Sequence, residues 1–320
     1  MLQAIVDSAT GDDVYKEDPT VNALEERIAD MFGMDQALFF PSGSMANQAA
    51  IKLHTQPGEQ LICHEYAHVY NYEGGGVSFN SGVSCKLLPG PDGMIDSASV
   101  KAAINPPDFY HSPLTSLVCL ENTTNKGGGA CYSLEQIDAI KQVTDEFELG
   151  LHLDGARLWN AMIATGQTAK DFGKRFDTIS VCLSKGLGTP AGSVLIGSEK
   201  YMRNAIRVRK LLGGGMRQIG LLAGAGMYAL DNNLKRLADD HKHARELATA
   251  LAARDGVTLV NEVQTNIVLY RTTAGAGEAL QNVYDELNVR VSEMGPGLFR
   301  IVTHLDYSVE HHRLLINRLR

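Results

Sequence analysis

Cysteine is scarce in this sequence, and its spacing matches no common metal or disulfide site. The five cysteines are an odd number and include no Cys-x-x-Cys pair, the spacing that many zinc and redox sites use. Cys63, Cys119 and Cys182 fall in apolar runs that look like strands, which favours buried thiols in a reducing compartment. We therefore expect no metal site and a cytoplasmic protein.

The sequence also lacks a long apolar run and an excess of positive charge. No apolar stretch reaches the roughly 20 residues of a membrane-spanning helix, and no signal peptide is visible. The net charge of −8 argues against a nucleic-acid partner. Neither Gly-x-Gly-x-x-Gly nor Gly-x-x-x-x-Gly-Lys-Ser/Thr accompanies the turn Ser42-Gly43-Ser44, which argues against a nucleotide-binding protein.

What the sequence does contain is an alternation of strand-like and helix-like segments. Of its 320 residues, 44% are hydrophobic and 21% are charged, as in ordinary globular proteins. The alternation indicates an α/β fold in which helices cover a mostly parallel central sheet. Because the pattern changes near Leu230, we expect a large domain over 1–230 and a small C-terminal α/β domain over 231–320.

The periodicity of the apolar residues predicts the individual elements. Strands are expected at 37–40, 61–64, 86–88, 116–120, 150–154, 179–183 and 194–197, and then at 257–260, 267–270, 289–292 and 299–302. Helices are expected at 19–32, 48–53, 134–148, 200–212 and 232–254. The last of these helices joins the two domains, and the Pro-rich stretch 106–113 is expected to be a surface loop.

A lysine stands directly after one of the buried strands. Lys185 lies in Ser184-Lys185-Gly186-Leu187-Gly188-Thr189-Pro190, which follows the strand expected at 179–183. Lysine is seldom buried without a reason, and a desolvated lysine amine can form a Schiff base with a carbonyl. The alternative, equally favoured by this segment alone, is a solvated lysine in a Gly-rich turn.

An acid and an arginine follow the neighbouring strand. Asp154 ends the strand expected at 150–154, and Arg157 comes three residues later, near the start of a helix. Open α/β sheets bind ligands at such strand ends. Pyridoxal phosphate needs a lysine, an acid beside its ring nitrogen and a cradle for its phosphate. The alternative for Asp154 is a helix N-cap.

The segment 41–47, between a strand and a helix, offers the cradle. Free backbone N–H groups and the helix dipole make such a turn an anion site. Gly43 lets the backbone approach the ligand, Ser44 supplies a hydroxyl, and Met45 follows them. The alternative is an ordinary turn with a serine cap.

Together these segments resemble the low-specificity L-threonine aldolases, pyridoxal-phosphate enzymes of fold type I. The similarity extends over nearly the whole chain, in the segments 11–22, 41–47, 67–75, 120–123, 152–160, 183–190, 213–218 and 300–306. The resemblance implies a fold type I architecture, with a large cofactor-binding domain and a small C-terminal domain. It also implies cleavage of L-threonine, L-allo-threonine and related β-hydroxy amino acids to glycine and an aldehyde.

The resemblance assigns roles to individual residues. It implies that Lys185 carries pyridoxal phosphate and that Asp154 keeps the ring nitrogen protonated. It implies that His68 stacks on the cofactor near the substrate hydroxyl, with Tyr72 beside it. Without the resemblance, a structural histidine is the favoured interpretation of His68. The base that takes the hydroxyl proton remains open between His68 and an ordered water.

Four cations also receive roles from the resemblance. Arg300, together with Arg157, is expected to bind the substrate carboxylate, a task suited to guanidinium groups. Arg217 and Lys210 lie in a basic, Gly-rich segment that, in the family, reaches across a subunit interface toward a neighbour's phosphate. The resemblance therefore implies a homo-oligomer with shared sites, a dimer of dimers.

Two departures from the family pattern bear on activity. In the family, a Ser-Asp-Thr or Ser-Asp-Asn strand usually precedes the Gly-Asp-Asp-Val-Tyr segment, and its serine contacts the substrate carboxylate. Here only ten residues precede Gly11, which indicates a truncated sequence, an incomplete gene model or a variant without that serine. Thr124 occupies the place of a histidine in many relatives. The alternatives are therefore another fold type I lyase, such as a phenylserine aldolase or a β-eliminating lyase, and an inactive homologue that only binds the cofactor.

Overall fold

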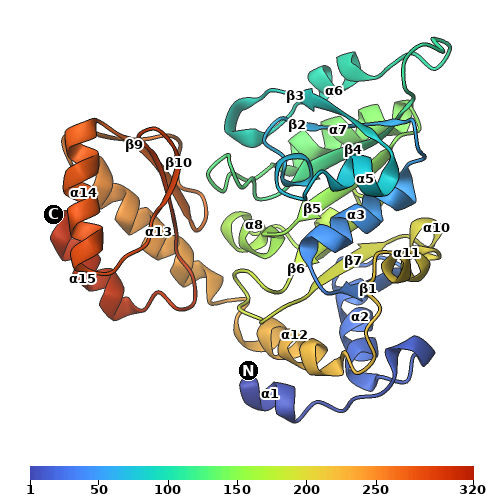
Figure 1. Ribbon diagram of the computed structural model, residues 1–320, viewed down its shortest axis with the longest axis horizontal. Coiled ribbons are helices and arrows are strands. Elements are labelled where there is room, and N and C mark those ends of the chain that lie inside the picture. Colours follow the sequence, from blue (N-terminus) through green and yellow to red (C-terminus); the bar gives the residue numbers. More distant parts are fainter.

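The chain forms two β-sheets, each with its own set of helices (Figure 1). The computed structural model describes residues 1–320. Its larger sheet has seven strands in the order β1-β7-β6-β5-β4-β2-β3. Neighbouring strands are parallel from β6 through β5, β4 and β2 to β3, and β7 runs antiparallel to both of its neighbours, β6 and the edge strand β1. This topology confirms the expected α/β fold with a mostly parallel sheet.

The strands of the large sheet are β1 (Gln36–Phe40), β2 (Gln60–His64), β3 (Ser84–Leu88), β4 (Thr115–Glu121), β5 (Gly150–Gly155), β6 (Thr178–Cys182) and β7 (Ser193–Gly197). The helices within and just after this sheet are α1 (Leu2–Val6), α2 (Pro19–Phe32), α3 (Gly43–His54), α4 (His68–Asn71), α5 (Gly76–Ser81), α6 (Ser97–Ala103), α7 (Leu134–Glu146), α8 (Leu158–Thr165), α9 (Ala169–Gly173), α10 (Glu199–Met202), α11 (Ala205–Leu211) and α12 (Gly220–Asn232). Two short 3-10 turns are η1 (Asp13–Tyr15) and η2 (Pro91–Gly93).

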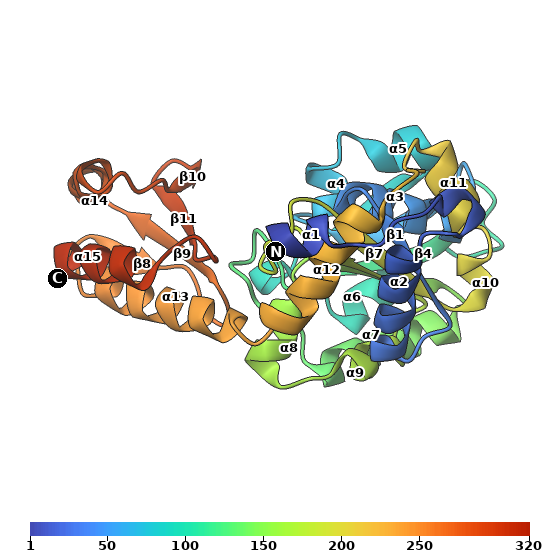
Figure 2. The same ribbon diagram turned by 90° about the horizontal axis from the view of Figure 1, so that it is seen from below.

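The small sheet is antiparallel and has the order β10-β11-β9-β8. Its strands are β8 (Val257–Leu259), β9 (Ile267–Thr272), β10 (Ser292–Gly295) and β11 (Leu298–Val302). The helices α13 (Leu237–Ala252), α14 (Ala274–Glu286) and α15 (Val309–Leu319) pack with it around a second hydrophobic core. Figure 2 shows α13 leading from the large part of the molecule to the small one. No helix is long and apolar enough to cross a membrane.

Helices cover both faces of the large sheet. On one face, α2, α7, α8 and α12 contribute to a core that includes Leu151, Leu153, Ile179 and Val181. The opposite face carries α3, whose Ala46, Ala49 and Ala50 belong to a separate apolar cluster with β1 and β7. Because side chains alternate along a strand, β5 and β6 turn a different set of residues toward α3.

The first long helix shows how local sequence sets an element's bounds. The side chain of Asp18 accepts hydrogen bonds from the backbone N–H groups of Thr20 and Val21, and Pro19 occupies the first turn of α2, where its missing N–H costs nothing. Gly33 ends the helix with φ +63°, a conformation that glycine adopts readily. The predicted helix 19–32 is confirmed at both ends.

Three expectations differ from the structure, and one helix is unpredicted. The helix expected at 200–212 is two helices, α10 and α11, and the one expected at 232–254 begins five residues later, at Leu237. The strand expected at 289–292 is wrong, because β10 begins only at Ser292. No helix was expected over 220–232, where Gly220, Gly224 and Gly226 lower helix propensity. The domain junction predicted after residue 230 falls in the last turn of α12 and stays a prediction.

Candidate active site

A cavity of about 300 Å3 lies where the carboxyl ends of β5 and β6 meet the N-terminus of α3. Both strands are parallel, so the residues that follow them emerge at one edge of the sheet. The lining residues are Pro41, Ser42, Gly43, Ser44, Asn47, His68, Asp154, Ala156, Cys182, Ser184, Lys185, Pro190 and Ala191. The structure therefore brings Lys185, Asp154, His68, Gly43 and Ser44 together.

Lys185 lies half-buried in the turn after β6. The backbone N–H of Gly188 donates to the Lys185 carbonyl oxygen at 2.8 Å, and Gly188 has φ +76°. This tight turn places the lysine among the cavity residues instead of continuing the strand. A half-buried amine in a polar cavity is suited to reaction with a carbonyl group.

Asp154 is 1% exposed and has a defined partner on each carboxylate oxygen. Its Oδ1 accepts from the backbone N–H of Ala156 at 3.1 Å, and its Oδ2 accepts from Nδ2 of Asn47 at 3.0 Å. It does not cap α8, because the N-cap of that helix is Arg157. A buried carboxylate among donors at the floor of a cavity can accept the N–H of a ligand ring.

The N-terminus of α3 forms the opposite wall of the cavity. Ser42 is the N-cap, and its hydroxyl accepts from the backbone N–H of Met45 at 3.2 Å. The N–H groups of Gly43 and Ser44 are among those for which an α-helix has no internal partner, and they add to the positive end of the helix dipole. A Cβ at Gly43 would lie 2.7 Å from Sγ of Cys182, so glycine is required there.

Met45 is placed differently from Gly43 and Ser44. Its side chain is not among the cavity residues, and its sulfur lies so close to Gly214 that a Cβ there would collide with it. Its backbone N–H is already bound by Ser42. The residue therefore packs against the Gly-rich segment after α11.

His68 begins α4 and is held by two acids. Its backbone N–H donates to Glu121 at 2.9 Å, and its Nδ1 lies 3.0 Å from Oε1 of Glu73. The hydrogen bond to Glu73 raises the pKa of His68 above its usual value, against the opposing effect of burial. The ring of Tyr72 lies 5.5 Å from the His68 ring. The structure thus couples an imidazole in the cavity to a buried carboxylate.

Glu121 is the last residue of β4 and lies next to His68. Its two oxygens accept from the backbone N–H groups of His68 and Asn125. Burial, together with the negative charge of Asp154, raises the pKa of Glu121 to about 7. Its main structural effect is to join the start of α4 to the loop that follows β4.

Two arginines from different parts of the chain meet at one amide oxygen. Arg157 precedes α8 and Arg300 lies on β11, yet their guanidinium groups donate to Oδ1 of Asn125 at 3.3 and 2.9 Å. Burial, with the positive charge of Arg157 nearby, lowers the pKa of Arg300 to about 10. Nε of Arg300 is buried without a partner. Two converging guanidinium groups are suited to a carboxylate.

Lys210 and Arg217 do not reach this cavity. Arg217 is exposed and pairs with Asp12 at 2.7 Å. Lys210 is exposed and lines a different hollow with Val14 and Met216. Within one chain, the structure therefore leaves both cations on the surface.

Thr124 points away from the site. It is 1% exposed, and its hydroxyl donates to the backbone carbonyl of Asp92 at 2.7 Å. It packs against the turn η2 instead of forming a wall of the cavity. Sequence reasoning missed Asn47, Asn125 and the pairing role of Glu73. The only signal for Asn47 and Glu73 was their place inside the matched segments, and Asn125 lies just after the segment 120–123.

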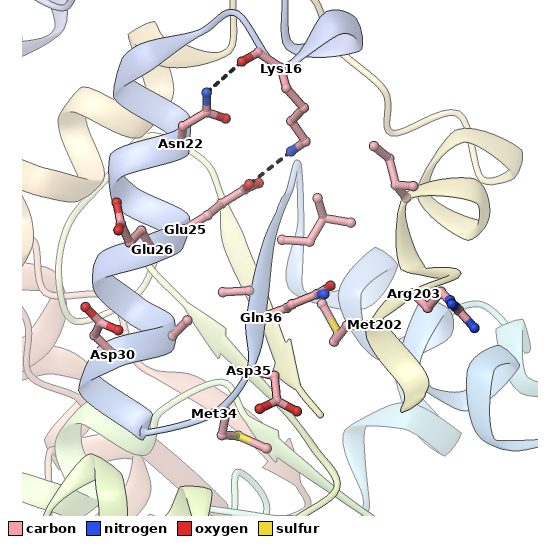
Figure 3. A pocket seen from close by; sticks show the side chains of 14 residues that line it. Lys16, Asn22, Glu25, Glu26, Asp30, Met34, Asp35, Gln36, Met202 and Arg203 are labelled. Carbon is pink, nitrogen blue, oxygen red and sulfur yellow. Dashed lines mark hydrogen bonds and ion pairs between the residues drawn. The ribbon is translucent and has the colours of Figure 1, made fainter. Parts of the chain in front are cut away.

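A wider hollow of about 580 Å3 lies on another side of the large sheet, between α2, β1 and α10 (Figure 3). In it, Nζ of Lys16 pairs with Glu25 at 3.1 Å, and the carbonyl of Lys16 accepts from Asn22. It contains no lysine at the end of a strand. The smaller cavity is the better candidate, because several chemically distinct groups converge there.

The residues of the smaller cavity fit pyridoxal phosphate. The N–H groups at the start of α3 suit a phosphate, the Asp154 carboxylate suits a protonated ring nitrogen, and the Lys185 amine suits an aldehyde. The missing side chain at Gly43 gives the cradle room that a Cβ would fill.

Comparison with known proteins agrees with this fit. The beta-eliminating lyase family profile matches residues 1–274. The chain is 40% identical to the low specificity L-threonine aldolase of Escherichia coli (strain K12) over 311 residues, which cover 97% of this chain and 91% of that protein. It is 40% identical to low-specificity L-threonine aldolase 1 of Arabidopsis thaliana over 313 residues, covering 95% and 87% of the two chains.

Solved structures share the fold. The threonine aldolase of Leishmania major has a TM-score of 0.86 at 24% identity, with coverage of 100% of this chain and 94% of that one. A putative L-allo-threonine aldolase from Listeria monocytogenes has a TM-score of 0.85 at 22% identity, with coverage of 100% and 92%. These likenesses confirm the expected fold.

Proposed function

This chain belongs to the low-specificity L-threonine aldolases of the beta-eliminating lyase family, and we propose that it cleaves L-threonine and L-allo-threonine to glycine and acetaldehyde. It is a pyridoxal-phosphate-dependent lyase. The observation that carries the proposal is the convergence of Lys185, Asp154, His68 and the N-terminus of α3 in one cavity. The proposed substrate is the one in the names of the relatives, which are L-threonine aldolases.

Each group of the cavity has a part in this reaction. Pyridoxal phosphate, when bound, withdraws electrons from the substrate bond that breaks. Lys185 would hold the cofactor through its amine, and the carboxylate of Asp154 would accept the ring N–H. The N–H groups of Gly43 and Ser44 and the serine hydroxyl bind the phosphate. The backbone of Met45 supports this turn, since its N–H is used by Ser42.

A second group of side chains binds the substrate. Arg157 and Arg300, whose guanidinium groups converge on Asn125, bind its carboxylate. Tyr72, whose ring lies 5.5 Å from the His68 ring, contacts the substrate beside His68. His68 takes the proton of the β-hydroxyl, the Cα–Cβ bond breaks and the aldehyde leaves. A proton then added at Cα completes glycine. Nδ1 of His68 is occupied by Glu73, so the proton of the hydroxyl moves to Nε2. An ordered water in place of His68 is the alternative.

We also propose that the active form is a homo-oligomer, a dimer of dimers, whose subunits share sites. Lys210 and Arg217 are exposed in the single chain, and their role requires a second subunit's cavity. Large apolar side chains are exposed on the same large domain, such as Phe79 at 90%, Tyr15 at 70% and Leu211 at 69%. A subunit interface would cover surface of this kind. The five free cysteines favour a cytoplasmic location.

The experiment that tests the function uses the purified full chain. After addition of pyridoxal phosphate, the wild type is expected to gain a visible absorbance band that Lys185→Ala lacks. Threonine and allo-threonine should then yield acetaldehyde, measured by its coupled reduction with NADH. A folded wild type without the band would overturn the proposal.

The products separate this function from its alternatives. Cleavage of phenylserine alone would indicate a phenylserine aldolase, and pyruvate from serine would indicate a β-eliminating lyase. The absorbance band without any product would identify a cofactor-binding homologue that lacks activity.

A further inference from the structure

A strip of buried polar side chains lies beneath the cavity, between α3 and the strands β5 and β6. On this face β5 carries His152 and Asp154, and β6 carries Thr178 and Ser180, each at most 2% exposed. Buried polar groups destabilise a core unless they are hydrogen-bonded. The apolar clusters on this face lie to either side, so the strip interrupts an otherwise ordinary core.

Asn47 of α3 stands at the centre of this strip, and both ends of its amide are fully used. Its Nδ2 donates to Oε1 of Glu73 at 2.8 Å and to Oδ2 of Asp154 at 3.0 Å. Its Oδ1 accepts from Oγ of Ser180 at 2.6 Å and lies 3.2 Å from Nε2 of His152. Since a side-chain amide has two hydrogens and two lone pairs, these four contacts hold it in a single orientation.

The two carboxylates decide which end of the amide faces them. A reversed amide would set its oxygen against both acids, so Nδ2 must point toward Glu73 and Asp154. The oxygen then accepts from Ser180 and from a hydrogen on Nε2 of His152. Burial lowers the pKa of His152 to about 4, so its ring is neutral near neutral pH.

Further hydrogen bonds lead from His152 to His54, the last residue of α3. With its hydrogen on Nε2, His152 accepts at Nδ1 from the Thr178 hydroxyl at 2.9 Å, and the same nitrogen lies 3.2 Å from the backbone carbonyl oxygen of Thr178. Thr178 in turn accepts from Nε2 of His54 at 2.8 Å. The donors in this chain all point toward the two carboxylates, and aligned hydrogen bonds strengthen one another in a medium of low dielectric constant.

We propose that Asn47 is a positioning residue for both halves of the site: one amide group fixes Asp154 beneath the cofactor and Glu73 behind His68. Asp154 sets the place of the ring nitrogen, and Glu73 sets the orientation and charge of the imidazole. Because both acids accept from the same nitrogen, displacement of one disturbs the other. This inference rests on the proposed function of the cavity as a pyridoxal phosphate site.

The neighbouring Gln48 provides a matched control. Its Nε2 donates to Oε2 of Glu73 at 2.6 Å, but no hydrogen bond joins it to Asp154. Truncation at Gln48 therefore removes a donor from Glu73 alone, whereas truncation at Asn47 removes a donor from both acids. Both residues are buried and adjacent on α3.

The test compares Asn47→Ala with Gln48→Ala by two readouts that do not depend on turnover. The first is the dissociation constant for pyridoxal phosphate, and the second is the NMR titration midpoint of His68 in the cofactor-free protein, assigned with His68→Asn. Asn47→Ala should weaken cofactor binding about ten-fold or more, the effect expected for a lost hydrogen bond to a charged group, and should shift the midpoint. Gln48→Ala should shift the midpoint and leave cofactor binding within about two-fold of the wild type.

The outcomes separate the inference from the proposed function. Wild type that fails to bind the cofactor overturns the proposed function. If wild type binds it, the inference is wrong when Asn47→Ala changes neither readout or only one, or when Gln48→Ala weakens binding as much. If Asn47→Ala does not fold, Asn47→Asp replaces it in the test, because it preserves the side-chain volume. It places a third carboxylate beside Asp154 and Glu73, and should weaken cofactor binding at least as strongly as the alanine variant.

Discussion

Gly43 lies so close to Cys182 that the proposed phosphate cradle has no room for a side chain. We expect Gly43→Ala to destabilise the protein by about 1 to 3 kcal/mol, because overpacking forces neighbouring groups to shift, and to weaken cofactor binding. The atom in the way is Sγ of Cys182, 2.7 Å from the place that a Cβ would take. The double variant Gly43→Ala/Cys182→Ala should recover much of both losses, as measured by urea unfolding and cofactor titration. No recovery would mean that the loss arises from the backbone of the turn.

Protonation of His68 should cause the loss of activity at low pH, the acid limb of the pH profile. Its hydrogen bond to Glu73 raises its pKa above 6.5, and only the neutral ring can accept a proton at Nε2. We expect kcat/KM to fall as the pH drops through this raised pKa, and Glu73→Gln to move that limb to lower pH. Measured pH profiles for both proteins test this, and an unchanged limb would favour water as the base.

The same pair also contributes to stability. Because the folded pKa of His68 lies above its unfolded value, this contribution is complete below about pH 6.5 and is lost as the pH rises through the folded pKa.

At the scale of elements, Asp18 holds two helices together. Its Oδ1 caps α2 by accepting from Thr20 and Val21, and its Oδ2 accepts from the N–H of Gly220 at the start of α12 at 2.8 Å. We expect Asp18→Ala to lower the free energy of unfolding by about 2 to 4 kcal/mol, since it removes a cap and a second charge-assisted bond. Asp96 caps only α6 from an exposed position, so Asp96→Ala should cost about 1 kcal/mol in the same urea titration.

The elements show what the sequence can predict and where it stops. The place of Lys185 and Asp154 can be predicted because each buried parallel strand is a run of apolar residues in the sequence. The carboxyl ends of such strands lie at one edge of the sheet. The strand β10 cannot be placed from the sequence because its residues are exposed or half-buried. Its sequence therefore has no regular alternation of apolar and polar residues. Asn47 was missed because its partners lie 26 and 107 positions away in the chain, a pairing that only the folded sheet creates.

At the scale of the whole molecule, the proposed sharing of sites can be tested by mixing inactive subunits. Lys185→Ala lacks the lysine proposed to hold the cofactor, and Arg217→Ala lacks the cation proposed to reach the partner's phosphate. In a hybrid dimer, one site carries both defects. The other combines an intact Lys185 with an intact Arg217 from the partner. Random assembly makes half of the dimers hybrids with one intact site each, so the mixture should regain about a quarter of the wild-type activity.

The control for this experiment is the double variant Lys185→Ala/Arg217→Ala mixed with each single variant, which leaves no site intact and should stay inactive. If Arg217 served the cavity of its own chain, every site in the mixture of single variants would lack one group, and mixing would restore nothing. Arg217 is paired only with Asp12 on the surface of the single chain. A role in the chain's own cavity would therefore require that segment to move across the surface, whereas a role in the partner's cavity requires only that the two chains associate.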